Sequence, residues 1–100
     1  MTLTQLAYFV ALADVRNFTR AAELVGVAQS TLSRQVRALE EELGAPLVDR
    51  GARAGLALTP AGEALLPLAR RMLADAESAR TAVAEIVGLR RGRVRIGATP

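Results

Sequence analysis

A short stretch of the chain carries side chains that could recognise the base edges and phosphates of DNA. Over residues 29–43 the apolar positions recur at helical spacing and leave a polar face opposite them. The polar side chains on this face and its flanks are Ser30, Thr31, Ser33, Arg34 and Arg37. An Arg can bind guanine through two hydrogen bonds, and a hydroxyl can contact a base or a phosphate. These residue types favour contact with a major groove.

Along this predicted helix the basic residues come before the acidic ones. An ordinary solvent-exposed helix face has no need of such a separation. Glu40, Glu41 and Glu42 are confined to the C-terminal turn, and the N-terminal half has no acidic residue. The N-terminal end also offers backbone N–H groups and a positive dipole end to a phosphate. The pattern therefore favours a DNA-reading helix.

A small β-hairpin is predicted next, from extended stretches at residues 47–48 and 56–58 around a Gly-rich tip. Arg50 and Arg53 bracket this tip, where no bulky side chain obstructs approach. Such a wing could reach the DNA backbone or the minor groove beside the recognition helix. The alternative is that the two are ordinary surface arginines on a solubilising loop.

The composition leaves little chemistry for catalysis or metal binding. The chain has no Cys and no His, and all 13 of its basic residues are Arg. Only carboxylates, hydroxyls and Tyr8 remain, and no pair of carboxylates is isolated in an apolar setting. We therefore expect no enzyme activity and no metal site. No signal peptide and no membrane-spanning apolar run are recognisable, so a soluble, cytoplasmic protein without a membrane partner is expected.

The elements that would position these residues are mainly helices. Helices are predicted from Thr2, as N-cap, to about Asp14, and over residues 18–25 and 29–43. The spacing of Ala22, Gly26 and Leu32, with a three-residue turn, is typical of a helix-turn-helix. The residues expected to face inward are Ala21, Ala22, Leu24, Val25, Leu32, Val36, Leu39 and Leu43.

A long helix is predicted from Pro60, with Thr59 as its N-cap, to about Val87. It would be about 40 Å long. A seam of apolar residues alternates at spacings of 4 and 3, which is typical of a coiled coil and predicts dimerisation. The seam residues are Leu65, Ala69, Met72, Ala76, Ala79, Val83 and Ile86. Gly88 and Gly92 are expected to end the helix before a strand over residues 93–96.

Four blocks of sequence together resemble LysR-type transcriptional regulators. They are residues 18–24, 29–36, 39–44 and 58–62, and the similarity extends over residues 3–97. The resemblance implies a winged helix-turn-helix, a dimerising linker helix and a C-terminal effector-binding domain that this chain lacks. The positions that match DNA-contacting residues of that family are Gln29, Ser30, Thr31, Ser33, Arg34, Arg50 and Arg53.

The predicted organisation is therefore a winged helix-turn-helix over residues 1–59, a linker helix over 60–89, and a hinge with a first strand over 90–100. We expect sequence-specific binding to a (pseudo)palindromic promoter site as a homodimer, or as a tetramer in the full-length protein, at the nucleoid. No cofactor is expected in these residues, whereas the missing domain would bind a small-molecule effector. The alternative is a winged-helix interaction module without DNA binding, which would carry apolar anchors on the outer face of residues 29–43.

Overall fold

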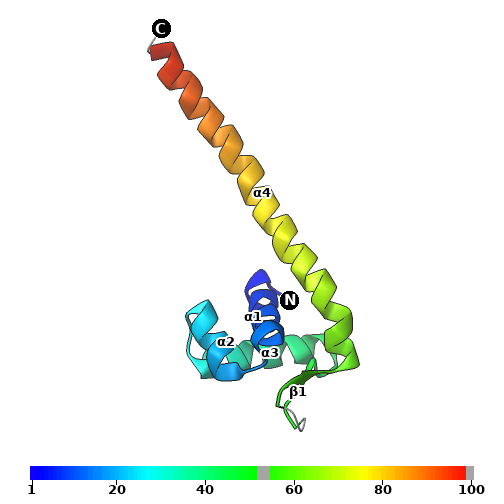
Figure 1. Cartoon of the computed structure of the whole chain (residues 1–100). Helices are drawn as coiled ribbons and strands as arrows, with labels where there is room; N and C mark the ends of the chain where they lie inside the picture. The colour runs from blue at the N-terminus through cyan, green and yellow to red at the C-terminus, as the bar shows by residue number, and fades with distance from the viewer. Residues whose placement is uncertain (52–54, 99–100) are drawn as a thin grey trace.

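The protein is a small helical body from which one long helix projects (Figure 1). The computed structural model describes residues 1–51 and 55–98, with side chains as far as Arg90. Its elements are α1 (Leu3–Val15), α2 (Phe18–Val25), α3 (Gln29–Leu43), β1 (Val48–Asp49), β2 (Ala57–Leu58) and α4 (Pro60–Ala98). The mainly helical fold class is confirmed, with a winged helix-turn-helix followed by a long helix.

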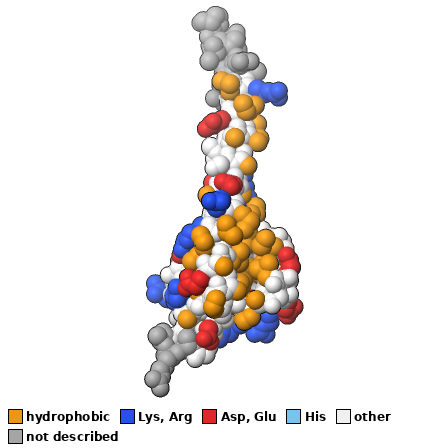
Figure 2. All heavy atoms as spheres, turned by 90° about the vertical axis from the view of Figure 1, so that its right-hand side faces the viewer, with side chains coloured by type: hydrophobic (Ala, Val, Ile, Leu, Met, Phe, Trp, Pro, Cys, Tyr) orange, Lys and Arg blue, Asp and Glu red, His pale blue; other side chains and the backbone are white. Residues whose placement is uncertain are grey.

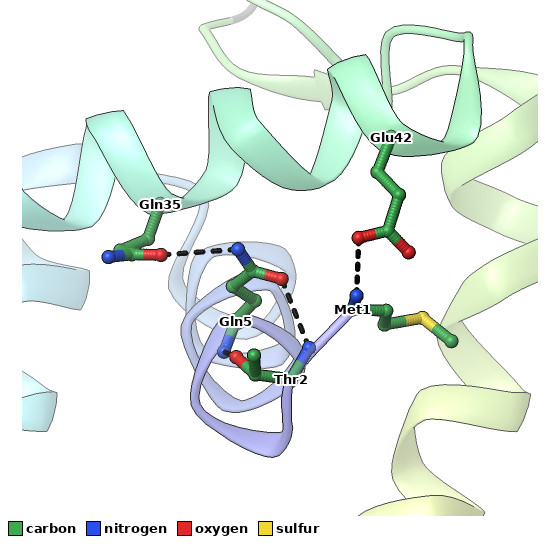
Figure 3. A network of polar contacts seen from close by, with 5 residues as sticks. All are labelled: Met1, Thr2, Gln5, Gln35 and Glu42. Carbon is green, nitrogen blue, oxygen red and sulfur yellow. Dashed lines mark hydrogen bonds and ion pairs between the residues drawn. The ribbon is translucent and has the colours of Figure 1, made fainter.

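The start of α1 is attached to α3 by a polar network (Figure 3). Thr2 Oγ1 accepts from the backbone N–H of Gln5 at 3.0 Å, and Gln5 Oε1 accepts from that of Thr2 at 3.0 Å, which confirms the capping box. Gln5 Nε2 also donates to Gln35 Oε1 at 3.2 Å. The amino group of Met1 pairs with Glu42. The N-terminal turn of α1 and the second half of α3 are thereby held together.

The helix-turn-helix is formed by α2 and α3. Asn17 Oδ1 accepts from the backbone N–H of Arg20 at 2.9 Å and caps α2. Gly26 ends α2 with φ 75°, a left-handed conformation that residues with a Cβ rarely adopt. Ala28 precedes α3 without a side-chain cap. The tight turn sets the angle at which α3 leaves α2.

The core fills the space between the helices and the base of the hairpin. Its largest fully buried side chains are Leu6, Phe9, Leu12, Leu32, Val36, Leu39 and Leu47. Two residues expected to face inward do not: Leu24 is 65% exposed and Leu43 is 43% exposed. Leu24 lies about 110° around α2 from the middle of its buried face. Leu43 is the last residue of α3, at the margin of the core.

The hairpin joins the body to α4. Val48 pairs with Leu58 and Asp49 with Ala57 in an antiparallel register. The hydroxyl of Thr59 donates to the carbonyl of Pro46 at 2.6 Å and accepts from the backbone N–H of Gly62 at 3.1 Å. Thr59 is therefore the N-cap of α4, as predicted, and it also connects this helix to the loop before β1.

The length of α4 differs from the prediction. The helix runs through Gly88 and Gly92 to Ala98, so residues 93–96 are helical and not the predicted strand. Gly lowers helix propensity by only about 1 kcal/mol, which does not by itself end a helix. An extended segment would need a neighbouring strand for its backbone N–H and C=O groups, and none lies beside it in the described part of the chain. A helix pairs these groups internally.

Candidate nucleic-acid interface

The outer face of α3 has the polar character that the sequence predicts. Gln29, Ser30, Arg34 and Arg37 are exposed. Thr31 and Ser33 are half-buried on the flanks. No ion pair involves Arg34 or Arg37 within residues 1–51 and 55–90, so both guanidinium groups are available to a ligand.

The position of Gln29 is set by a residue that the sequence analysis did not single out. The hydroxyl of Thr19, in the first turn of α2, donates to Gln29 Oε1 at 3.0 Å. This bond occupies the amide oxygen and leaves the amide N–H groups free to donate. Gln29 is therefore oriented as a donor at the N-terminal end of α3.

Glu40, one of the three glutamates in the C-terminal turn of α3, has a buried side chain. It is 9% exposed, and its Oε2 accepts from the backbone N–H groups of Leu47 at 2.7 Å and Val48 at 3.3 Å. Glu40 comes four residues after the buried Val36, so it lies near the inner face of α3. This spacing is the signal that could have identified it. Its carboxylate connects the recognition helix to the wing.

Arg50 is held by the protein itself. Its Nη1 lies 3.8 Å from Glu40 Oε1, and its guanidinium carbon lies 5.0 Å from the centre of the Phe18 ring. A cation at this distance from a ring face is attracted by the ring quadrupole. In this structure Arg50 joins the wing to α2 and α3, and its contact with DNA stays a prediction. Arg53, the second predicted wing contact, lies outside the described residues.

An open groove of about 500 Å³ separates α3 from the wing and the turn between α1 and α2. It is lined by Arg16, Asn17, Phe18, Gln29, Ser33, Arg37, Arg50, Gly55 and Leu56. Three of these residues are arginines from three different elements, and no carboxylate is among them. The fold thus brings Gln29, Ser33 and Arg37 together with cations that are distant in the sequence. Ser30, Thr31 and Arg34 are not part of this groove.

The predicted seam of α4 is divided between two environments. Ala69 is fully buried, and Leu65 and Met72 are half-buried against the core, so this part of the seam packs within its own chain. The first half of α4 lies beside α1, where Arg70 Nη2 is 2.5 Å from Asp14 Oδ1. Ala69 was predicted to face a second subunit, and this prediction is wrong because its side chain is buried in its own chain.

The second half of the seam is uncovered. Ala76 is half-buried and Ala79 is exposed, while Val83 and Ile86 are 64% and 57% exposed. Figure 2 shows hydrophobic side chains gathered at the base of α4 and recurring along it. The dimerisation prediction remains for these four positions.

Within residues 1–51 and 55–90, His, Cys, Asp and Glu side chains form no group of three that could hold a metal ion. Over the same ranges, no helix combines the length and the apolar character needed to cross a bilayer.

Comparison with known sequences identifies related proteins. Residues 3–63 match the family model described as bacterial regulatory helix-turn-helix protein, lysR family. The chain is 46% identical over 98 residues to the SDS degradation transcriptional activation protein of a Pseudomonas species, covering 98% of this chain and 32% of that protein. It is 44% identical over 99 residues to the transcriptional regulator BudR of Klebsiella aerogenes, covering 99% and 68%. The chain spans about a third of the length of several such relatives.

Solved structures with the same fold include complexes with DNA. The DNA-binding domain of BenM bound to catB site 1 DNA matches with a TM-score of 0.82 and 38% identity, covering 87% of this chain and 97% of that chain. Vibrio fischeri DarR in complex with DNA matches with a TM-score of 0.83 and 36% identity, covering 89% and 30%.

Proposed function

The chain belongs to the LysR family of bacterial regulatory helix-turn-helix proteins, and we propose that it binds double-stranded DNA as a homodimer, with α3 of each protomer in a major groove. The observation that carries this proposal is the polarity of α3. Its exposed N-terminal part presents amide, hydroxyl and guanidinium groups without a carboxylate, while Glu40 is directed to the wing. A surface of this kind matches the acceptors of guanine and the charge of phosphates.

Within this face, Arg34 is the residue we assign to base recognition. It is exposed, unpaired within the described residues, and one turn beyond Ser30 on the same side of α3. A bidentate contact from Arg to guanine discriminates against the wrong base by about 1–3 kcal/mol. Arg37 lies further along the helix and lines the groove, which suits a contact with the DNA backbone.

An interaction module without DNA binding is less well supported. It would need apolar anchors on the outer face of α3, where a partner would bury them. That face exposes no large apolar side chain in the described residues: Gln29, Ser30, Arg34 and Arg37 are polar, and the exposed Ala38 is small.

The dimer is proposed to form through the uncovered half of α4. Val83 and Ile86 share one face of the helix, and a second copy of that face would bury both. A two-fold dimer presents two α3 helices to a (pseudo)palindromic site, with half-sites one helical turn apart or a multiple of it. We place this activity in the cytoplasm, where bacterial DNA lies. We also propose that a small-molecule effector acts through a further domain, in keeping with the greater length of the relatives.

The proposal is tested by selecting preferred duplexes from a random library and measuring their dissociation constants against salt concentration. Arg34→Ala should weaken binding to the selected duplex by about 1–3 kcal/mol and relax the preference at one base pair of each half-site. Arg71→Ala removes an exposed charge from α4 and is the control, expected to leave the base preference unchanged. A wild-type chain that enriches no duplex sequence would contradict the proposal.

A further inference from the structure

The turn between α1 and α2 contains an unusual residue. Arg16 has φ 54° and ψ 34°, and it is the one non-glycine residue with positive φ among residues described here. Its backbone N–H donates to the carbonyl of Leu12 at 2.8 Å and closes α1. The left-handed conformation brings Cβ close to the following carbonyl oxygen in L-residues, so glycine is the residue that fits this position without strain.

The side chain of Arg16 is partly anchored and partly free. Its Nε donates to the carbonyl of Ala13 at 2.9 Å, which holds the guanidinium near the end of α1. No carboxylate in the described part of the chain forms an ion pair with it. The terminal amino groups of this exposed side chain remain available to a ligand.

Arg16 lies in the groove that also contains Arg37 of α3 and Arg50 of the wing. Arg50 is engaged by Glu40 and Phe18, whereas Arg37 has no such partner within the described residues. Two free cations therefore border one open groove without a carboxylate in its lining. The charge of this lining favours an anionic ligand.

We propose that Arg16, together with Arg37, binds a backbone phosphate of the DNA strand beside the major groove that α3 reads. This inference rests on the proposed function. In a helix-turn-helix the first helix crosses the backbone while the second lies in the groove, and Arg16 lies two residues before that first helix, α2. Arg16 thus adds affinity without adding sequence preference. Its strained conformation is retained because glycine would supply no charge.

The test compares wild type, Arg16→Gly, Arg16→Lys and the control Arg71→Ala on the selected duplex and on a random duplex. Each Arg16 that neutralises one phosphate contributes about 0.9 to the salt slope of log K. At 0.15 M salt this corresponds to about fivefold in affinity for each Arg16, and so to about 25-fold for a dimer. Arg16→Gly should lose this factor on both duplexes without lowering Tm, while Arg16→Lys should retain most of the affinity.

The outcomes separate this inference from the proposed function. Wild type that prefers the selected duplex, with Arg16→Gly binding like Arg71→Ala, overturns the Arg16 contact alone. A weaker Arg16→Gly with a lower Tm and an unchanged salt slope assigns Arg16 a structural role and also overturns it. The last experiment measures the Tm of wild type and of Arg16→Gly in inorganic phosphate and in chloride at equal ionic strength. If phosphate raises the Tm of wild type but not of Arg16→Gly, and both bind DNA equally, the groove holds a free anion and the proposal fails.

Discussion

At the scale of single residues, Glu40 connects α3 to the wing. Its carboxylate accepts hydrogen bonds from the backbone N–H groups of Leu47 and Val48, at the start of the wing. It also pairs with Arg50, whose guanidinium lies over the Phe18 ring. One side chain of α3 thereby determines where the wing sits relative to the helix that would read DNA. This carboxylate therefore has a structural role, although Glu40 is one of three consecutive glutamates.

Replacing Glu40 with Ala should destabilise the fold. The change leaves the buried N–H groups of Leu47 and Val48 without an acceptor, and each unsatisfied group costs about 1–3 kcal/mol. We expect the free energy of unfolding, measured by urea denaturation, to fall by about 2–6 kcal/mol. Glu40→Gln retains an acceptor oxygen and should lie between Ala and wild type. The exposed neighbour Glu41 is the control, since Glu41→Ala should change stability by less than about 0.5 kcal/mol; equal losses at both positions would contradict this role.

At the scale of elements, the first turn of α4 crosses the loop before β1 at very close range. A Cβ built on Gly62 would lie 2.1 Å from the carbonyl oxygen of Leu47, which also accepts from the backbone N–H of Thr59 at 3.0 Å. A glycine is therefore required for the backbones to approach. The same turn thus sets both the start of α4 and its distance from the wing.

Gly62→Ala should separate the helix from the loop and lower the free energy of unfolding by about 1–3 kcal/mol, as overpacking does. Gly88 provides a matched control on the same helix, because a Cβ there meets nothing within 4 Å. Gly88→Ala should instead stabilise the protein by about 0.5–1 kcal/mol, since Ala is the better helix former. Thermal unfolding of the two variants measures the difference. The explanation fails if Gly62→Ala is as stable as Gly88→Ala.

An ion pair between Asp14 of α1 and Arg70 of α4 also connects two elements. The hydrogen bond and the charge of Asp14 raise the pKa of Arg70 above its ordinary value. When the folded-state pKa of a cation is raised, the stabilisation of the fold by that cation is present at any pH below its unfolded-state pKa. The stabilisation is lost only as the pH rises past the folded-state pKa. The contribution of Arg70 is therefore constant across the physiological pH range. Because both side chains are exposed, we expect this pair to orient α4 more than to stabilise the fold.

At the scale of the whole molecule, the long helix has two roles in two segments. Its first half completes the core through Ala69, and its second half projects with Val83 and Ile86 exposed. The molecule measures 67 × 24 × 21 Å, so the projecting part has no described element of its own chain beside it. An isolated apolar stripe of this length favours a partner helix, and a second copy would supply one.

Val83→Asp should weaken the proposed dimer. The change removes apolar area from each copy and places a carboxylate in the contact, so the dissociation constant should rise on the order of 100-fold. Thr81, exposed on the opposite face of α4, provides the control Thr81→Asp. Sedimentation at micromolar concentration should show a dimer for wild type and control and a monomer for Val83→Asp. A monomeric wild type would rule out this interface.

The sequence by itself determined much of the local structure of the first three helices. The start of α1 and the ends of α2 and α3 follow from short-range signals, namely the Thr2 capping box and the left-handed Gly26 and Gly44, because caps involve residues within one turn of each other. The polar outer face of α3 was predictable for the same reason, since the 3.6-residue period alone determines which side chains share a side.

Only the tertiary structure decided what covers each face. Periodicity identifies an apolar stripe but not its partner, so it could not tell that Ala69 packs within its own chain while Val83 does not. It also could not place Glu40 beneath the wing or bring Arg16 to the groove beside Arg37, because these contacts join residues whose distance depends on how the helices pack. The residues proposed for DNA recognition were readable along one helix, but the groove beside them exists only once three elements meet.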